Sequence, residues 1–266
     1  MEPALIPAAG RGTRLRPITH HLSKPMLPIG SVPVIHYSIR EALSAGCSPV
    51  VVIRGAGDRE LHRYVQKEFD ERVRLTVQRE PRGLADALLR GYRLLDDPDR
   101  CAALLPDNVV LNGDGIGSLL EVDEVCTVLG TTRVTRQEAS YFGNSGDYEA
   151  DCLDESSHLE QIQSLQAKGE GSFFRRHDEW PVRRSVARNV LTAEFFERAA
   201  ERSPDPETGE VDDVPILRSM IKSTRVLGFP VGGDVHDMGT PERYLRLNQV
   251  MAEQSQTSNG IDPIHD

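Results

Sequence analysis

The stretch AAGRGTRLRPITHHLSKPMLPIG, residues 8–30, follows a short apolar run and sets Gly10 and Gly12 among several arginines. Glycine tolerates positive φ and close approach by a ligand, so the backbone N–H groups of residues 9–13 can face phosphates. The third glycine of the dinucleotide-binding fingerprint is missing, and Arg14 would take its helix-packing position. No Gly-Lys-Ser/Thr follows, which excludes a Walker A loop. The stretch predicts a polyphosphate site, and the plainer alternative is a tight turn after a parallel strand.

Composition restricts the class of protein. The chain has 266 residues and a net charge of −10, so the whole molecule repels nucleic acid and anionic membranes, and an anionic ligand needs a local cationic pocket. The four cysteines form no C-x-x-C pair, which argues against a structural zinc site. There is no secretory signal pattern, and no run reaches the ~18 apolar residues of a membrane helix. We expect a cytoplasmic protein without nucleic-acid or membrane partners.

The first part of the chain alternates between strand and helix patterns. Strands are predicted at 4–6, 49–54, 72–78 and 101–107, and helices at 35–43, 61–69 and 84–95. This order is typical of an α/β fold with a Rossmann-like, mainly parallel mixed sheet flanked by helices, whose ligands bind beyond the carboxyl ends of the strands.

The pattern loosens after about residue 123. Strands are expected at 125–134 and 223–231, a hairpin within 141–161, and helices at 193–200 and 211–221. Thr240, Pro241 and Glu242 supply an N-cap, a first-turn proline and a first-turn acid, which predict a final helix. We expect a single domain over 1–256, with halves at about 1–122 and 123–256, followed by a polar tail at 257–266.

The opening stretch resembles the signature of the sugar-1-phosphate nucleotidylyltransferases, G-x-G-T-R-x-x-P-x-T and then, after a spacer, P/S-K-x-x-x-P. Every position is filled, by Gly10, Gly12, Thr13, Arg14, Pro17, Thr19, Lys24 and Pro28. The similarity extends to about residue 250 and is closest to glucose-1-phosphate uridylyl- and thymidylyltransferases. It implies the fold of nucleotide-diphospho-sugar transferases. It also implies catalytic roles for Arg14, at the departing pyrophosphate, and Lys24, at the α-phosphate, with nucleotide binding by Ala8, Ala9, Gly10, Gly12 and Thr13.

Two aspartates lie in segments that resemble the metal-binding segments of this family. Asp107 follows a predicted buried strand, and Asp237 precedes the capped final helix. Mg²⁺ needs only one or two carboxylates besides phosphate oxygens and water, so the pair fits Mg²⁺, with Asp107 also counted as nucleotide-binding. Alternatively Asp107 starts a turn and Asp237 serves a helix N-terminus. Asp114, Asp234 and His236 are weaker candidates.

The stretch QREPRGLADAL, residues 78–88, resembles the base-binding segment of the family. Gln78 would end a strand and Gly83 would open the next helix. A glutamine amide offers a donor and an acceptor, which match the N3–H and neighbouring carbonyl of uracil or thymine. The resemblance therefore implies UTP or dTTP, while the alternative is an ordinary polar residue at a strand end.

The acceptor half departs from the family pattern. Gly143 survives behind an inserted Phe142, Lys168 survives without the usual glutamate and proline, and Ala187 replaces a glycine. We assign acceptor binding to Gly143, Lys168 and Asn189. The basic run of Arg175, Arg176, Arg183 and Arg184 could serve a more anionic acceptor or belong to the surface.

The resemblance implies a Mg²⁺-dependent enzyme that joins UTP or dTTP to a sugar-1-phosphate, above all glucose-1-phosphate, releasing pyrophosphate. Two alternatives stay open: transfer to another phosphate or phosphonate acceptor, and a non-catalytic nucleotide-binding relic. The resemblance also suggests a homodimer or homotetramer.

Overall fold

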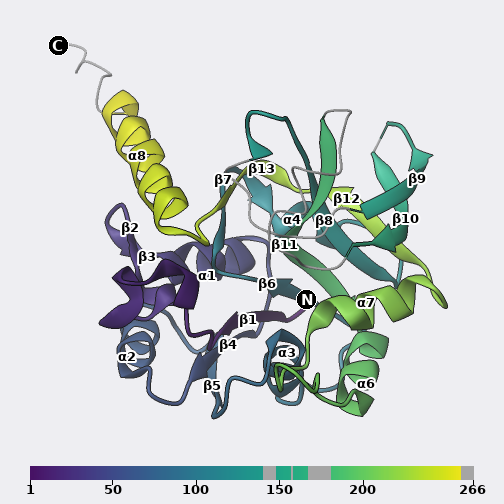
Figure 1. Cartoon of the computed structure of the whole chain (residues 1–266), viewed down its shortest axis with the longest axis horizontal. Coiled ribbons are helices and arrows are strands. Elements are labelled where there is room, and N and C mark those ends of the chain that lie inside the picture. Colours follow the sequence, from purple (N-terminus) through teal and green to yellow (C-terminus); the bar gives the residue numbers. More distant parts are fainter. Residues whose placement is uncertain (140–147, 157, 167–180, 259–266) are drawn as a thin grey trace.

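The computed structural model describes residues 1–139, 148–156, 158–166 and 181–258. Its main feature is a nine-stranded sheet in the order β5-β4-β1-β6-β11-β8-β12-β10-β9 (Figure 1). Its strands are β1 (Ala4–Ala8), β4 (Val50–Gly55), β5 (Val73–Gln78), β6 (Arg100–Leu104), β8 (Thr127–Val134), β9 (Tyr148–Asp154), β10 (Leu159–Leu165), β11 (Val182–Thr192) and β12 (Val226–Pro230).

The sheet is mixed, which confirms the predicted fold class. The first four strands in the order run parallel, and β12 runs parallel to β8. Strand β11 is antiparallel to both of its neighbours, β6 and β8, and so joins the two halves of the chain. The described part of the predicted hairpin is the antiparallel β9–β10 pair.

Helices cover both faces of the sheet. One face carries α1 (Val34–Ser44), α2 (Arg59–Glu68) and α4 (Ile116–Leu120). The other carries α3 (Leu84–Tyr92), α6 (Ala193–Glu201) and α7 (Asp213–Ile221), which lie together in Figure 1.

The sequence accounts for these layers. In α1, Ile35, Ile39 and Ala42 repeat at helical spacing and are buried against the sheet. In β1, Leu5 packs into the cluster around α3 and α6, whereas Ala4 and Ile6 pack into the cluster around α1 and α2. This alternation is that of a strand buried on both faces.

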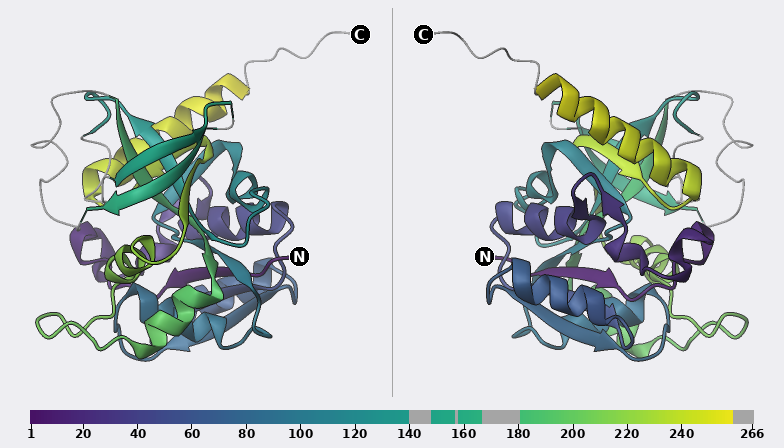
Figure 2. Two further views of the ribbon diagram at one scale, coloured as in Figure 1. Left: turned by 90° about the vertical axis from the view of Figure 1, so that its right-hand side faces the viewer. Right: turned by 90° about the vertical axis from the view of Figure 1, so that its left-hand side faces the viewer.

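A third apolar cluster anchors the amino-terminal stretch. Leu15, Leu27 and Ile29 pack with residues of β7 (Asn108–Gly115) and α8 (Pro241–Ser258). The short elements of this region are η1 (Thr13–Leu15), η2 (Ile18–His20), η3 (Lys24–Met26), β2 (Pro28–Ile29) and β3 (Val32–Pro33). Strand β13 (Gly232–Asp237) pairs antiparallel with β7, and α8 runs beside β13 at the outer side of the molecule (Figure 2).

Element boundaries differ from the sequence predictions by a few residues at several places. The strand predicted to reach residue 107 ends at Leu104, because Pro106 lies in a turn before β7. Helix α3 ends at Tyr92 rather than at residue 95. Helix α7 begins at Asp213, since the Val211 backbone is engaged in hydrogen bonds with Arg82 and Ala85 at the start of α3.

Candidate active site

A cavity of about 610 Å³ opens beyond the carboxyl ends of β1, β5 and β6. This is the end of the parallel strands at which ligands of α/β proteins bind. Among the residues that line it are most of those predicted from the sequence: Ala8, Ala9, Gly10, Gly12, Thr13, Arg14, Lys24, Gln78, Gly83 and Asp107. The fold thus brings four separate stretches of sequence to one cavity.

The glycine loop has the conformation that its sequence requires. Gly12 has φ 61° and ψ 29°, in the left-handed region, and Thr19 Oγ1 donates to its carbonyl at 2.8 Å. A Cβ at Gly12 would lie 3.1 Å from the side chains of Lys24 and Thr19. Around Gly10, by contrast, a Cβ would meet nothing within 4 Å. The loop is therefore packed at Gly12 and open to a ligand at Gly10.

Lys24 and Asp107 form an ion pair on the cavity wall. Lys24 Nζ lies 2.6 Å from Asp107 Oδ2, and the two side chains are 17% and 25% exposed. Burial opposes ionisation of Asp107, but the Lys24 ammonium, a hydrogen bond from Asn108 and the charge of Arg14 outweigh it and lower the pKa of this carboxyl. Asp107 is thus an anion held between cationic groups.

Backbone hydrogen bonds hold the segment that contains Asp237 against the segment that contains Asp107. It pairs with Asn108 in the β13–β7 ladder, and the N–H of Met238 donates to the Asp107 carbonyl at 2.9 Å. The Asp237 carboxylate accepts from the N–H of Gly239 at 2.6 Å and from Arg243 at 3.4 Å. It borders a second cavity of about 350 Å³, together with the weaker candidates Asp234 and His236.

The two aspartates suit a hard divalent cation by their chemistry, since carboxylate oxygens are the ligands Mg²⁺ takes from proteins. Within the described ranges no three His, Cys, Asp or Glu side chains gather as a metal cluster. Mg²⁺ does not require such a cluster, because water and phosphate oxygens complete its coordination.

Gln78 is the polar residue at the end of β5 and is only 4% exposed. Its Nε2 donates to the carbonyl of Gly83 at 3.1 Å and to Asp86 Oδ2 at 2.7 Å. The donor half of the amide is therefore engaged by the protein. This corrects the expectation that Gln78 offers both halves to a base.

Gly83 is the N-cap residue of α3, with φ 97°, and so precedes the helix as predicted. A Cβ there would lie 2.5 Å from the carbonyl oxygen of Val211. The Val211 backbone donates to Arg82 at 2.7 Å and accepts from Ala85 at 3.0 Å, so the loop before α7 closes over this glycine. Thr208 and Glu210 of the same loop line the main cavity and were not anticipated from the sequence.

Of the predicted acceptor residues, only Asn189 lies within the described part of the chain. Gly143 and Lys168, with Arg175 and Arg176, lie outside the described residues. Asn189 pairs with Ala103 and Leu129 inside the sheet, and it is not among the lining residues of the main cavity.

The remaining two arginines of the basic run lie on β11, away from the cavity lining. Arg183 forms an ion pair with Glu160 at 2.7 Å. Arg184 is 1% exposed, so it does not belong to the surface.

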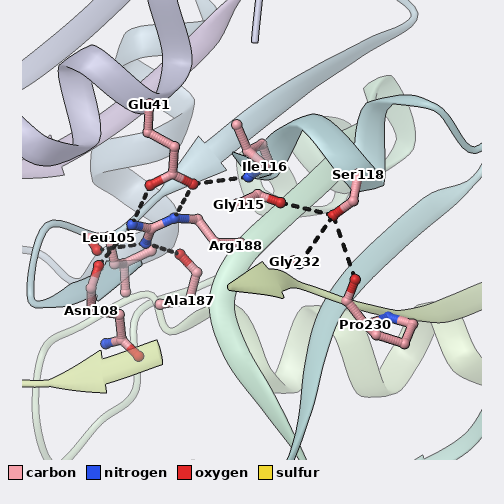
Figure 3. Close-up of polar contacts among 10 residues, drawn as sticks. All are labelled: Glu41, Leu105, Asn108, Gly115, Ile116, Ser118, Ala187, Arg188, Pro230 and Gly232. Atoms are coloured by element: carbon pink, nitrogen blue, oxygen red, sulfur yellow. Dashed lines mark hydrogen bonds and ion pairs between the residues drawn. The ribbon is translucent and has the colours of Figure 1, made fainter. Parts of the chain in front are cut away.

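A buried ion pair beside the cavity escaped the sequence analysis (Figure 3). Arg188 is fully buried, and its Nε and one terminal nitrogen each donate to Glu41 at 2.7 Å. The guanidinium also donates to the carbonyls of Leu105 at 3.1 Å and Asn108 at 2.7 Å, which bracket Asp107. Glu41 accepts further from the N–H of Ile116 at 2.9 Å. The pair therefore fixes the turn that carries Asp107.

A signal for Arg188 was present in the alternation of β11. It falls between Val186 and Val190 on the same face of the strand, and both valines are buried. A charged residue at such a position needs a buried partner.

Comparisons with known proteins show the family and the fold of the chain. The family profile described as "Nucleotidyl transferase" matches residues 3–143, more than half of the chain. The UTP--glucose-1-phosphate uridylyltransferase of Pseudomonas aeruginosa is 26% identical, over 94% of this chain and 95% of its own length. The protein of the same name from Bacillus subtilis is also 26% identical, over 94% and 91%.

Solved structures show the same fold. A UDP-glucose pyrophosphorylase complexed with UDP-glucose is similar with a TM-score of 0.79 and 25% identity, covering 96% of this chain and 99% of that one. A UTP-bound UGPase from Acinetobacter baumannii has a TM-score of 0.74 at 20% identity, covering 98% and 100%, and at that identity shows the fold alone.

The mixed sheet and the comparisons with known proteins together identify a nucleotidyltransferase, which is an enzyme. The chain belongs to the nucleotidyl transferase family. In the described part of the chain, no helix combines the length and apolar character needed to span a membrane.

Proposed function

We propose that the protein transfers a nucleotidylyl group from UTP or dTTP to a sugar-1-phosphate, with glucose-1-phosphate as the preferred acceptor and Mg²⁺ as the cofactor. The observation that carries the proposal is the convergence of the glycine loop, Arg14, Lys24 and Asp107 on one cavity. The names of the relatives at about a quarter identity support UTP and glucose-1-phosphate.

The reaction needs two anions to meet. An oxygen of the sugar phosphate attacks the α-phosphorus of the triphosphate, the bond from that phosphorus to the bridging oxygen breaks, and pyrophosphate leaves with that oxygen. Catalysis of this kind consists of positioning and charge stabilisation more than covalent chemistry. An otherwise acidic protein must therefore concentrate positive charge at the site.

Different residues of the cavity would bind the phosphates and stabilise their charge. Backbone N–H groups of the glycine loop would bind phosphate oxygens, and Arg14 would balance the charge of the departing pyrophosphate. Lys24 would stabilise the α-phosphate, and its ion pair with Asp107 already orients the ammonium at the cavity wall. Asp107 and Asp237 would hold Mg²⁺, which when bound neutralises phosphate oxygens.

The test is pyrophosphate release from a panel of nucleoside triphosphates and sugar-1-phosphates with Mg²⁺. We expect turnover with UTP or dTTP and glucose-1-phosphate, and no turnover across the panel by folded protein would refute the proposal. Lys24→Ala should lower kcat by about 10²–10³, the usual effect of removing a charge-stabilising group. Lys67→Ala, at an exposed lysine of α2, is the matched control and should retain full activity.

A second candidate differs only in the acceptor. Ala187 stands where the family pattern has glycine, and its carbonyl accepts from both the N–H of Leu105 and Arg188. This favours an acceptor side of altered shape, suited to another phosphate or phosphonate. Turnover of glucose-1-phosphate at a kcat/KM of about 10⁴ M⁻¹s⁻¹ or more would eliminate this candidate.

We also propose, from the family resemblance, a cytoplasmic homodimer or homotetramer. Light scattering coupled to gel filtration measures the assembly, and a monomer at micromolar concentration would contradict it.

A further inference from the structure

The amide of Gln78 has a defined orientation in the cavity. Both partners of its nitrogen, the Gly83 carbonyl and the Asp86 carboxylate, are acceptors only. The opposite orientation would place the amide oxygen against two other oxygens. The protein environment thus requires the NH₂ group to point toward α3, and the oxygen Oε1 is left for the cavity that Gln78 lines.

Asp86 is itself held in place. Arg90, one helical turn further along α3, donates to Asp86 from Nε at 2.8 Å and from a terminal nitrogen at 3.3 Å. Burial opposes ionisation of Asp86, but the hydrogen bonds from Arg90 and Gln78 outweigh it and lower its pKa. Asp86 is therefore an anion at neutral pH, and an anion cannot donate to Gln78.

A cavity-facing oxygen selects the hydrogen-bonding edge of a base. Uracil and thymine carry a hydrogen at N3 and can donate it to Oε1. Cytosine has an unprotonated N3, which would face Oε1 as a second acceptor with no proton between them. A site built around one hydrogen bond discriminates strongly against a ligand that leaves it unmade.

We propose that Asp86 is a specificity-determining residue: by fixing the amide of Gln78 it makes the site accept uracil or thymine and reject cytosine. This inference rests on the proposed function, because it takes a pyrimidine triphosphate as the ligand of the cavity. Asp86 acts through Gln78 and is a positioning residue, separate from the groups that balance phosphate charge.

The experiment compares kcat/KM for UTP and for CTP in the wild type and in Asp86→Asn. Asparagine keeps the shape but can donate as well as accept, so a turned Gln78 amide, which offers its NH₂ to N3 of cytosine, would oppose only the Gly83 carbonyl instead of two acceptors. We expect the UTP-to-CTP ratio to fall by about 10-fold or more, the effect of one hydrogen bond made by a charged group. Calorimetric binding of UTP and CTP gives the same ratio without turnover.

Two controls separate this role from general destabilisation. Glu60→Gln removes an acid from the first turn of α2, just as Asp86→Asn removes one from the first turn of α3, but Glu60 is exposed, so this change should leave the ratio unchanged. In a Gln78→Ala background, Asp86→Asn should also leave the ratio unchanged, because the residue it acts through is gone.

An Asp86→Asn ratio within about twofold of wild type overturns the inference, as does an equal loss in the Gln78→Ala background. A wild type that turns over neither UTP nor dTTP contradicts the proposed function instead. In that event the two calorimetric affinities still decide the role of Asp86.

Discussion

Replacing Arg188 with methionine should destabilise the protein strongly. The wild-type guanidinium makes five hydrogen bonds, two to Glu41 and three to backbone carbonyls, and is fully buried. Methionine fills a similar volume but makes none of these bonds. The variant therefore leaves the Glu41 carboxylate, 10% exposed, without its counter-charge.

The magnitude follows from which groups lose their partners. The carbonyls of Leu105 and Ala187 keep other bonds, from the N–H groups of Asn108 and Leu105, so their loss is small. Among the described residues, Glu41 keeps only its bond from Ile116. The cost is therefore that of breaking a buried ion pair from one side, about 3–5 kcal/mol in the free energy of unfolding.

The assay is urea unfolding followed by far-UV circular dichroism, with the free energy extrapolated to water. The double variant Glu41→Gln with Arg188→Met removes the stranded charge and should recover about 1–3 kcal/mol relative to Arg188→Met alone. The control is Arg225→Met, which breaks a half-exposed pair with Glu124 and should cost at most about 1 kcal/mol. A loss below about 1 kcal/mol for Arg188→Met, or no recovery in the double variant, would refute this reasoning.

Three further outcomes are expected. Gly83→Ala should lower both the melting temperature and the affinity for UTP, since its Cβ would lie 2.5 Å from a backbone oxygen; unchanged values would contradict the tight packing. Of the four cysteines only Cys152 is exposed, and burial raises the pKa of Cys47 to about 12, so at mildly alkaline pH Cys47 stays a protonated, slow thiol. An aromatic disulfide reagent should then find one fast thiol, attributable by Cys152→Ser, and more than one would count against this. A chelator should stop turnover without lowering the melting temperature, because Lys24 already pairs with Asp107 in the ligand-free protein; a lowered melting temperature would contradict this.

Local sequence patterns predicted the helices and strands whose own apolar residues show which side of the element is buried. The apolar run of β4 and the helical spacing of Ile35, Ile39 and Ala42 are signals of this kind. Strand β7 was missed because its residues 112–115 are Asn-Gly-Asp-Gly, which favours a turn. Its pairing with β13 is a contact between segments more than a hundred residues apart, and no local pattern encodes it.

The same distinction holds for the site. Residues 8–24 and 78–83 form contiguous motifs, so their convergence on one cavity could be expected from the strand order alone. Glu41 and Arg188 are 147 residues apart, and neither belongs to a motif. The orientation of Gln78 was also hidden, because it depends on the carboxylate of Asp86 one turn into the next helix. Residues that line the candidate site are therefore easier to predict from sequence than residues that position them.

The position of β11 has a consequence for any attempt to divide the chain. A fragment ending before residue 123 would keep the glycine loop, Gln78 and Asp107, yet it would lose the strand that covers the outer edge of β6. That edge, Arg100–Leu104, is largely apolar, and an uncovered strand of this kind invites self-association. Half of the molecule would thus be a poor minimal reagent for nucleotide binding, however complete its motifs.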